Sequence, residues 1–416
     1  TIMLENIRRY WDERPLALVL WIGFILRLTS VFISKGFGMH DDHFLVIEAP
    51  GAWAQGTEYD DWLPSSGATR PDGHSFFYSG FHFIFFSFMR VLGIEDPQFL
   101  MTLVRLFHAV LSLGTIYFGY RIAEHLSGKN NARIVGLLMA CFWFMPFISV
   151  RNLVEVVCIP FLMGGLWYII AAENRQKSFY FYFLAGLLFG IGFCIRFQSV
   201  FFIAGAGLGL LLQGRIRQTV TVAAGTLAVF IITQSPLDLY IWGYPFAQFI
   251  EYVRYNLEHA HSYLTGAWYK YLILILGILV PTLSILIFWG WLRNWRRSLP
   301  AFLAVFIFLA FHSYFPNKQE RFILPIVPFF IVLGIPGMME FFNANKENGF
   351  LRSLLKVSWI IFWVLNCILI LPVSTMYSKR ARVESMSYLY PKRDSINCII
   401  SEDMNRHMAY LSPQFY

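Results

Sequence analysis

The sequence predicts an all-α, polytopic membrane protein, built as a bundle of about eleven transmembrane helices. Of its 416 residues, 57% are hydrophobic and 14% are charged, whereas soluble domains contain roughly 45–50% apolar and about 25% charged residues. Near-continuous apolar runs recur along the chain, and a run of about 18 such residues is typical of a spanning helix. One polytopic bundle is therefore expected instead of several soluble domains. The expected spans are 15–34, 98–120, 133–150, 154–171, 180–196, 199–213, 218–234, 269–291, 300–314, 322–340 and 357–375.

Basic residues in the connections between these spans predict the orientation of the chain. Connections on the cytoplasmic side of a membrane carry the excess of Lys and Arg. The net charge of +8 is therefore interpreted as a signal of topology, and no nucleic-acid partner is expected. If all the basic connections are cytoplasmic, the N-terminal segment lies inside and segment 376–416 lies outside. The basic connections are 5–14, 120–133, 173–177, 214–218, 292–298 and 343–356.

This orientation requires that the apolar stretch 76–93 does not cross the bilayer. If it crossed, every later basic connection would change sides. The stretch contains His82 and Arg90, so we expect an amphipathic helix that lies in the membrane interface. The first outer loop, 35–97, then contains interfacial helices, and a second large outer loop covers 235–268.

Acidic residues gather in the first outer loop. Seven acids and two bases lie between residues 35 and 75. A transporter usually places its polar residues near the bilayer midplane, whereas this chain places them at the outer surface. That position favours an enzyme that acts on a membrane-tethered substrate. The seven acids are Asp41, Asp42, Glu48, Glu58, Asp60, Asp61 and Asp72.

Two of these acids, Asp41 and Asp42, are adjacent in the stretch "GMHDDHFLV". Neighbouring residues of a helix point about 100° apart, so the two carboxylates cannot face one ligand in the same way. The stretch is typical of a helix start, where an Asp caps the first turn and a second acid complements the dipole. A carboxylate beside a tethered substrate can instead deprotonate an acceptor hydroxyl. The residue types leave both interpretations open.

Transfer of a sugar from a lipid phosphate would also need cations for the leaving phosphate. Arg196 lies between two spans, where it is either an interfacial anchor or a phosphate ligand. The outer hairpin 315–321 is either a simple tether or a functional basic site. The aromatic residues of 251–272 belong to an interfacial belt or stack on sugar rings. The substrate-binding candidates are Arg70, Arg151, Glu155, Arg196, Asn256, His261, Tyr263, Trp268, Lys318 and Arg321.

No metal site and no cofactor are expected. His259 and His261 lie two residues apart, and no third ligand accompanies them, whereas metal sites in proteins commonly use three or four ligands. The five cysteines are scattered without a metal-binding or redox spacing.

Three motifs, in order, resemble one known family. "MHDDHF" (39–44) resembles the HPDEhF motif that follows the first span of the lipid-phosphate-mannose-dependent mannosyltransferases of N-glycan and GPI-anchor assembly, which are GT-C superfamily enzymes. "NKQERFILPIVPF" (317–329) resembles their HKExRFhhPhhP motif, and 238–272 is similar to their outer aromatic segment. "TRPDGHSF" and "CIRFQ" are weaker similarities to two further loops of the family. The chain resembles a bacterial-type member, with Met39–His40 where the family has His-Pro, Asn317 where it has His, and Gln319 where it has Glu.

The resemblance implies a GT-C glycosyltransferase domain over 1–375, with 376–416 as an outer segment that can begin a small domain. It also implies residue roles. Asp41 is expected to be the catalytic base and Asp42 to orient the acceptor or the loop, while Arg196, Lys318 and Arg321 hold the phosphate.

The expected activity is metal-independent, inverting transfer of a sugar, with mannose the first expectation, from a polyprenyl-phosphate carrier to a glycolipid or glycan acceptor. The expected location is a bacterial plasma membrane with the site on the periplasmic face, or the endoplasmic reticulum membrane in a eukaryote. Two alternatives remain open from the sequence: a transporter of polyprenyl-linked glycans, and a GT-C enzyme that uses a lipid-diphosphate donor and a metal held by Asp41 and Asp42.

Overall fold

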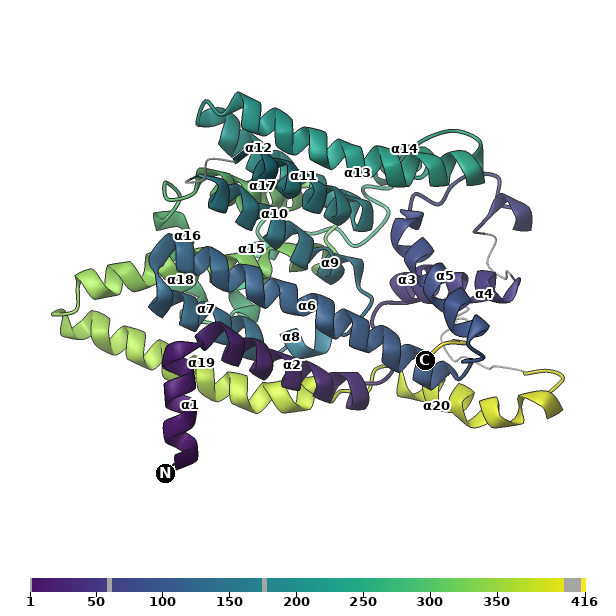
Figure 1. Cartoon of the computed structure of the whole chain (residues 1–416), viewed down its shortest axis with the longest axis horizontal. Coiled ribbons are helices and arrows are strands. Elements are labelled where there is room, and N and C mark those ends of the chain that lie inside the picture. Colours follow the sequence, from purple (N-terminus) through teal and green to yellow (C-terminus); the bar gives the residue numbers. More distant parts are fainter. Residues whose placement is uncertain (1, 58–61, 174–177, 400–412) are drawn as a thin grey trace.

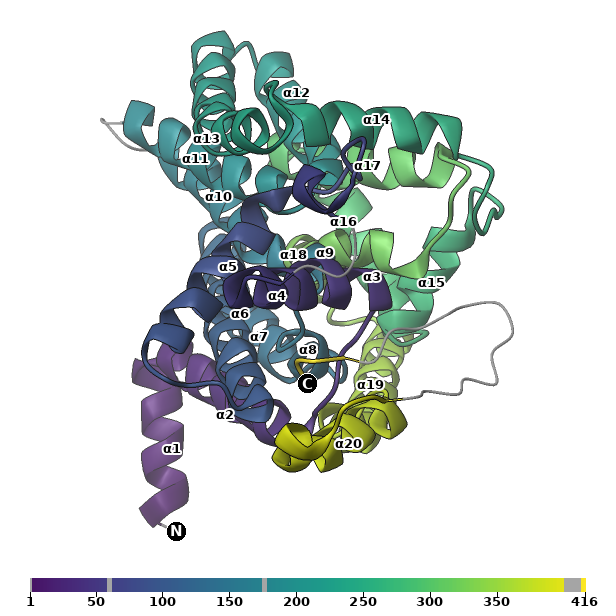
Figure 2. The same cartoon turned by 90° about the vertical axis from the view of Figure 1, so that its right-hand side faces the viewer.

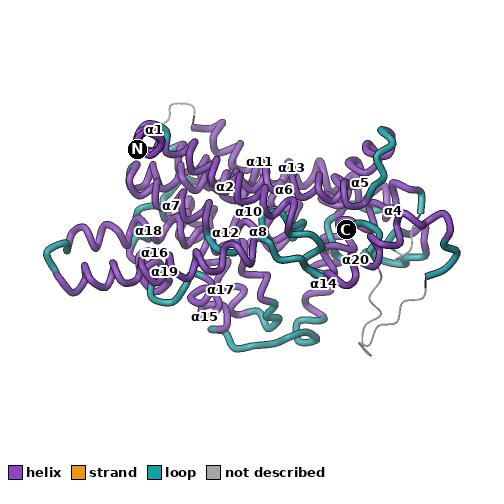
Figure 3. Tube along the Cα trace, turned by 90° about the horizontal axis from the view of Figure 1, so that it is seen from below, coloured by secondary structure: helices purple, strands orange, loops and turns teal. Residues whose placement is uncertain are grey.

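The computed structural model describes residues 2–57, 62–173, 178–399 and 413–416. Helices run along most of this trace (Figure 3), which confirms the predicted all-α class. An isolated antiparallel bridge joins Thr265 to Asn317. Three acids of the first outer loop (Glu58, Asp60 and Asp61) and residues 174–177 of one basic connection lie outside the described residues.

A helix occupies the place of each of the eleven expected spans. Six of the described helices are long and apolar enough to cross a bilayer, or seven if one bent pair counts as a single span. The remaining ones are shorter. The helices at these places are α2 (Pro15–Ile33), α6 (Pro97–Ser127), α7 (Lys129–Cys141), α10 (Ile159–Ala172), α11 (Ser178–Ile195), α12 (Val200–Leu212), α13 (Ile216–Trp242), α15 (Lys270–Ile278) with α16 (Leu283–Arg293), α17 (Leu299–Tyr314), α18 (Val327–Ala344) and α19 (Gly349–Ser374).

Shorter helices complete the fold, and most of them lie at one end of the bundle (Figure 1). Figure 2 looks onto this end. The short helices are α1 (Ile2–Glu13), α3 (His40–His43), η1 (Phe44–Glu48), α4 (Ala49–Gln55), η2 (Pro64–Ser66), α5 (Phe76–Val91), α8 (Met145–Ile148), α9 (Val154–Val157), η3 (Phe197–Ser199), α14 (Ala247–Glu258), η4 (Glu320–Ile326), α20 (Arg380–Leu389) and η5 (Tyr390–Ser395).

The expected span 269–291 is broken into α15 and α16, which meet at an angle of 115°. Pro281 lies in the break, and its neighbours Val280 and Thr282 have φ angles of 66° and 80°. Proline cannot donate the next helical hydrogen bond, and a positive φ ends the helical path for β-branched residues. The hydropathy of the segment does not reveal this bend, because both halves are apolar.

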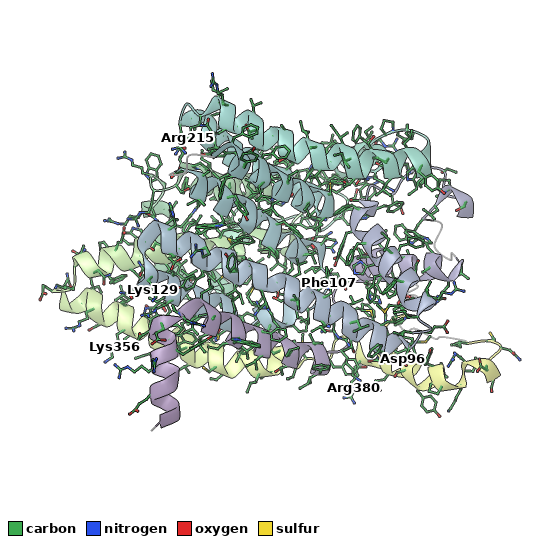
Figure 4. The ribbon with its side chains drawn as sticks, in the orientation of Figure 1. Asp96, Phe107, Lys129, Arg215, Lys356 and Arg380 are labelled. Atoms are coloured by element: carbon green, nitrogen blue, oxygen red, sulfur yellow. The ribbon has the colours of Figure 1, made fainter. Side chains whose placement is uncertain are left out.

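Three of the basic connections lie at the end of the bundle opposite to α3, α4 and α5. In Figure 4, Lys129, Arg215 and Lys356 lie at one end, and Asp96 and Arg380 lie toward the other. Each of these three basic residues belongs to a different predicted cytoplasmic connection. The structure therefore brings together these three connections (Figure 4), which the orientation argument assigned to one side.

Helix α5 does not run through the bundle, as predicted for 76–93. It lies with α3 and α4 at the end away from Lys129 (Figures 1 and 4). Ser75 caps its first turn, since the side-chain oxygen accepts a hydrogen bond from the Phe77 amide at 3.3 Å. His82 is buried against the protein, while Ile84 and Phe88 are exposed on the opposite face. This amphipathic pattern fits a helix at a membrane interface.

Small residues allow the spanning helices to approach closely. A Cβ atom added at Gly186 of α11 would lie 2.3 Å from the carbonyl oxygen of Val222 on α13. A Cβ atom at Gly290 of α16 would meet the Gly334 oxygen of α18 at the same distance. Close backbone contact of this kind is a common basis of helix packing within membranes, where burial of apolar surface supplies little drive.

Described residues of the segment 376–416 pack on the first outer loop. The Ser378 amide donates to the carbonyl oxygen of Lys35 at 3.1 Å. Phe415 is buried against Phe86 of α5, with ring centroids 4.7 Å apart. The Glu48 carboxylate accepts hydrogen bonds from the amides of Gln414 and Phe415 at 2.8–2.9 Å. Residues 413–416 thus fasten the helical turn that follows the acidic pair.

Candidate active site

A cavity of about 370 Å³ opens among the outer segments of the chain. Its walls come from α3, the loop before α5, the junction of α11 and α12, α14 with the turn after it, and the hairpin before α18. Its size lies within the range of roughly 300–1,000 Å³ that is typical of small-ligand sites. Among its lining residues are Asp41, Arg196, Asn256, Tyr263 and Arg321, so five of the sequence candidates meet in one place.

The adjacent acids have different surroundings. The Asp41 side chain is 62% exposed, whereas that of Asp42 is 11% exposed. The Arg321 guanidinium nevertheless contacts both of them: Nη2 lies 3.2 Å from Asp41 Oδ2, and Nη1 lies 2.6 Å from Asp42 Oδ2. The planar fork of arginine can bridge two diverging carboxylates with two nitrogens, which a single cationic point could not do.

A third carboxylate, that of Glu155, completes a buried charge cluster. Its Oε1 atom lies 3.1 Å from Arg196 Nη2 and 3.6 Å from Arg321 Nε. These are ion pairs only, because neither oxygen of Glu155 accepts a hydrogen bond from a described residue. Both guanidiniums also lie near the ring of Phe322, at 5.0 Å for Arg196 and 5.8 Å for Arg321.

The cluster raises the pKa of Asp42 from its usual 3.8 to about 7. Burial is the main cause, the negative charge of Glu155 adds to it, and Arg321 and Arg196 oppose it. Three carboxylates and two guanidiniums carry a formal charge of about −1. A proton on Asp42 removes this excess, so the cluster can accept a further negative group near neutral pH.

The aromatic wall comes from α14 and the turn after it. The hydroxyl groups of Tyr255 and Tyr263 are hydrogen-bonded to each other, and the Tyr255 ring stacks on His259 with centroids 4.3 Å apart. Asn256 donates a hydrogen bond from Nδ2 to the carbonyl oxygen of Tyr252 at 2.8 Å. This bond does not use the side-chain oxygen of Asn256, which can accept a hydrogen bond from a ligand. Aromatic faces beside amide and imidazole groups suit a sugar ring.

Lys318 does not line the cavity, in contrast to its predicted phosphate role. Its ammonium group is buried and donates to the carbonyl oxygens of His312, Ser313 and Phe315 at the end of α17. Carbonyls at a helix C-terminus lack intrahelical partners and attract cations. The sequence shows a basic hairpin but not the direction of each side chain, and only Arg321 of this hairpin turns to the acids.

Arg151 is also placed elsewhere. Its guanidinium is buried and donates to the carbonyl oxygens of Ser34 and Gly36, each at 2.8 Å. It therefore holds the turn that leads from α2 to α3. Asp42 and Glu155 also lie outside the cavity lining, where they are buried in the charge cluster. Three more predicted residues outside the lining are exposed: Arg70, His261 and Trp268.

Most of the lining residues were missing from the sequence candidates. His74 and Tyr252 line the cavity, and Gln198 accepts a hydrogen bond from Arg196 Nη2 at 2.8 Å. Each lies within two residues of a motif residue or in a segment of the family resemblance, but residue type alone did not separate them from their neighbours. The described residues contain no group of three or more His, Cys, Asp or Glu side chains that could hold a metal ion. Independence of a metal stays a prediction.

The helical bundle has the fold of the GT-C membrane glycosyltransferases. ArnT from Cupriavidus metallidurans bound to undecaprenyl phosphate is similar with a TM-score of 0.56, 15% identity, and coverage of 79% of this chain and 59% of that chain. The Archaeoglobus fulgidus oligosaccharyltransferase tethered with an acceptor peptide has a TM-score of 0.63 and 14% identity, over 95% of this chain and 60% of that one.

The chain belongs to the Alg9-like mannosyltransferase family, whose model matches residues 18–402. The family resemblance and the GT-C fold predicted from the motifs are thereby confirmed. An uncharacterized protein of Aquifex aeolicus (strain VF5) is 24% identical over 288 residues, which are 66% of this chain and 54% of that protein. The chain thus spans about half the length of this relative and about three-fifths of the two solved structures.

Proposed function

We propose that the chain is an inverting glycosyltransferase that moves a sugar, first of all mannose, from a polyprenyl-phosphate carrier to a hydroxyl group of a glycolipid or glycan. The observation that carries the proposal is the meeting of the Asp41 carboxylate with Arg321 in one cavity. The site thus offers a base and a cation within a few ångströms. Membership of a mannosyltransferase family supports the reaction class, and the ligands named for the similar structures, undecaprenyl phosphate and dolichol-phosphate, support the carrier.

In the proposed reaction Asp41 takes the proton of the acceptor hydroxyl. The hydroxyl oxygen attacks the anomeric carbon as the bond from that carbon to the phosphate oxygen breaks, and the phosphate leaves with the bonding electron pair. A single displacement of this kind inverts the anomeric centre and needs no covalent enzyme intermediate. Asp41 is suited to this role because its carboxylate is exposed to the cavity.

The leaving phosphate would be held by Arg196 and Arg321, the two guanidiniums of the cluster. Arginine binds phosphate through paired N–H groups. Asp42 would support Arg321 without contacting the substrate. It accepts a hydrogen bond from Arg321 Nη1, and its proton offsets the negative charge of the phosphate. Lys318 has no part in this scheme, since its ammonium group is bound to α17.

The proposed membrane side is the periplasmic face of a bacterial plasma membrane, or the lumenal face in a eukaryote. The cavity lies with α3 at the end opposite to Lys129, Arg215 and Lys356 (Figures 1 and 4). The positive-inside rule places these basic residues in the cytoplasm. The donor and the acceptor would then meet on the outer leaflet.

The test uses the purified protein in nanodiscs with a panel of polyprenyl-phosphate sugars and extracted glycolipids. Mass spectrometry of the lipids reads out transfer, with and without a chelator. We expect transfer from at least one polyprenyl-phosphate sugar, and a loss of about 10²–10⁴-fold in Asp41→Asn with donor binding retained. Asp394→Asn, a change of an exposed acid in η5, is the matched control and should keep the wild-type rate.

Several outcomes would overturn the proposal. Transfer at the wild-type rate by Asp41→Asn would show that Asp41 is not the catalytic base. Transport of intact lipid-linked glycans without transfer would favour a transporter. Strict dependence on a divalent metal with a lipid-diphosphate donor would favour a metal-dependent glycosyltransferase in which Asp41 and Asp42 hold the metal.

A further inference from the structure

His74 lies where two cavities meet. It lines the cavity of about 370 Å³ together with Asp41 and Arg196, and a narrower one of about 30 Å³ together with Asp42 and Tyr78. The smaller space is wide enough for about one or two water molecules. His74 therefore lines a shared space with each acid of the pair.

A buried polar network holds the backbone of this residue. Gln248 Oε1 accepts hydrogen bonds from the amides of Gly73 and His74, at 2.9 and 3.1 Å. The backbone amide of Gln248 in turn donates to Asp238 Oδ2 at 3.2 Å, and Gln234 Nε2 donates to Asp238 Oδ1 at 3.0 Å. Gln234, Asp238 and Gln248 are all fully buried. The four hydrogen bonds of this buried network resist movement, because breaking any of them leaves a further unsatisfied polar group.

The adjoining backbone is equally constrained. Gly73 has a φ angle of 76°, and a Cβ atom there would lie 2.9 Å from the backbone of Tyr252. Only glycine combines this conformation with so close an approach. Ser75 is fixed as well, since its hydroxyl group donates to Gln234 Oε1 at 2.9 Å. The loop therefore presents the imidazole of His74 from a fixed position.

The imidazole itself is left without a partner in the described part of the chain, since it makes no hydrogen bond to a described residue. Burial lowers its pKa from 6.5 to about 4, and the nearby positive charge of Arg196 adds to this effect. The ring is therefore neutral at ordinary pH, with one N–H donor and one nitrogen acceptor. A rigidly held ring with a free donor and a free acceptor is suited to a ligand group that can both accept and donate a hydrogen bond.

A sugar hydroxyl has that combination and a phosphate does not. Phosphate oxygens accept hydrogen bonds, and Arg196 and Arg321 already supply donors for them. A hydroxyl group both donates and accepts. We propose that His74 hydrogen-bonds a sugar hydroxyl beside the Asp41 carboxylate and so positions the sugar for transfer. This inference rests on the proposed glycosyl transfer, and the hydroxyl belongs either to the donor sugar or to the acceptor sugar.

The experiment is a cycle that combines His74→Ala with deoxy substrates. Two series are assayed, one with single deoxy positions in the donor sugar and one with single deoxy positions in the acceptor. In the wild type, one deoxy compound should lower kcat/KM by roughly 2- to 12-fold, the effect of one neutral hydrogen bond. In His74→Ala this compound and its parent should react equally. The series that contains this compound identifies the sugar that His74 binds.

Two further variants separate this role from a structural one. His74→Gln keeps a donor and an acceptor, and should regain part of the discrimination that His74→Ala loses. His125→Ala, at the basic end of α6, is the matched control and should discriminate as the wild type does. Thermal unfolding in detergent should show that each variant is folded.

The inference is overturned if every deoxy compound carries the same penalty in the wild type and in His74→Ala, while the wild type transfers sugar normally. That result would leave the proposed function intact. If the wild type transfers no sugar and Asp41→Asn changes nothing, the proposed function fails and the role of His74 falls with it.

Discussion

Replacement of Asp42 by Asn should stabilise the protein at pH 8 and should not do so at pH 4. Asp42 is buried beside Glu155, and its pKa is raised to about 7 from a usual value of 3.8. The unfolded chain therefore releases this proton near pH 4, whereas the folded chain keeps it until about pH 7. Between these values the folded state binds more protons, so the free energy of unfolding falls as the pH rises.

The magnitude follows from the two pKa values. They differ by about three units, and each unit corresponds to ~1.36 kcal/mol. The free energy of unfolding of the wild type should thus fall by up to about 4 kcal/mol between pH 4 and pH 7. Asp42→Asn should avoid most of this fall. The amide oxygen can still accept a hydrogen bond from Arg321, so the contact at 2.6 Å is weakened and not lost.

The assay is thermal unfolding of both proteins in the same detergent from pH 4 to pH 8. The difference in Tm between Asp42→Asn and the wild type should be near zero at pH 4 and should grow to a plateau above pH 7. Asp41→Asn is the matched control, because its side chain is largely exposed, and it should show no such growth. A difference that is constant with pH, or a lower Tm for Asp42→Asn at pH 8, would refute the assignment of a buried, electrostatically destabilised carboxyl group.

Three other substitutions test separate contacts. Arg321→Lys should lower kcat/KM by about tenfold or more, because an ammonium group lacks the planar, paired N–H groups with which Arg321 contacts both carboxylates; an unchanged kcat/KM would contradict the bridging role. Lys318→Met should lower the stability by about 1–3 kcal/mol through unpaired carbonyls at the end of α17, while the KM for the donor stays constant; a large rise in that KM would restore the phosphate role. Glu48→Gln should weaken the hydrogen bonds to Gln414 and Phe415, and should lower both Tm and kcat; wild-type values of both would show that this contact does not support the acidic pair.

The sequence predicts the fold well where a property such as hydropathy or charge can be summed over neighbouring residues. Hydropathy summed over about 18 residues locates the helices at the expected spans, and three of the basic connections lie at one end (Figure 4), as the charge rule leads us to expect. The apolar stretch of α5 resembles a span by composition, and only the sidedness of the later loops separates it from one. The break at Pro281 was missed, since both flanking halves are apolar and a proline within a span is often tolerated.

The site was predicted less completely, because side-chain direction depends on the tertiary structure. Asp41 and Arg321 were found from motifs and do meet. Lys318 was taken from the same motif as Arg321, and the two side chains point to different partners. His74 lies in a segment of weak similarity to the family that did not single it out, and its position depends on Gln248, 174 residues away. Contacts at such separations leave no local pattern.

The contact between Glu48 and the segment 413–416 has a consequence for the timing of biosynthesis. The amide of Gln414 that binds Glu48 lies 366 residues farther along the chain. At about 5–20 residues per second, the ribosome needs roughly 20–70 s to make the intervening chain. During that interval the spans can enter the membrane one after another while the turn behind the acidic pair still lacks its fastening. This part of the protein would therefore acquire the geometry of the acidic pair only once residues 413–416 have been made, after the preceding helices are already in the bilayer.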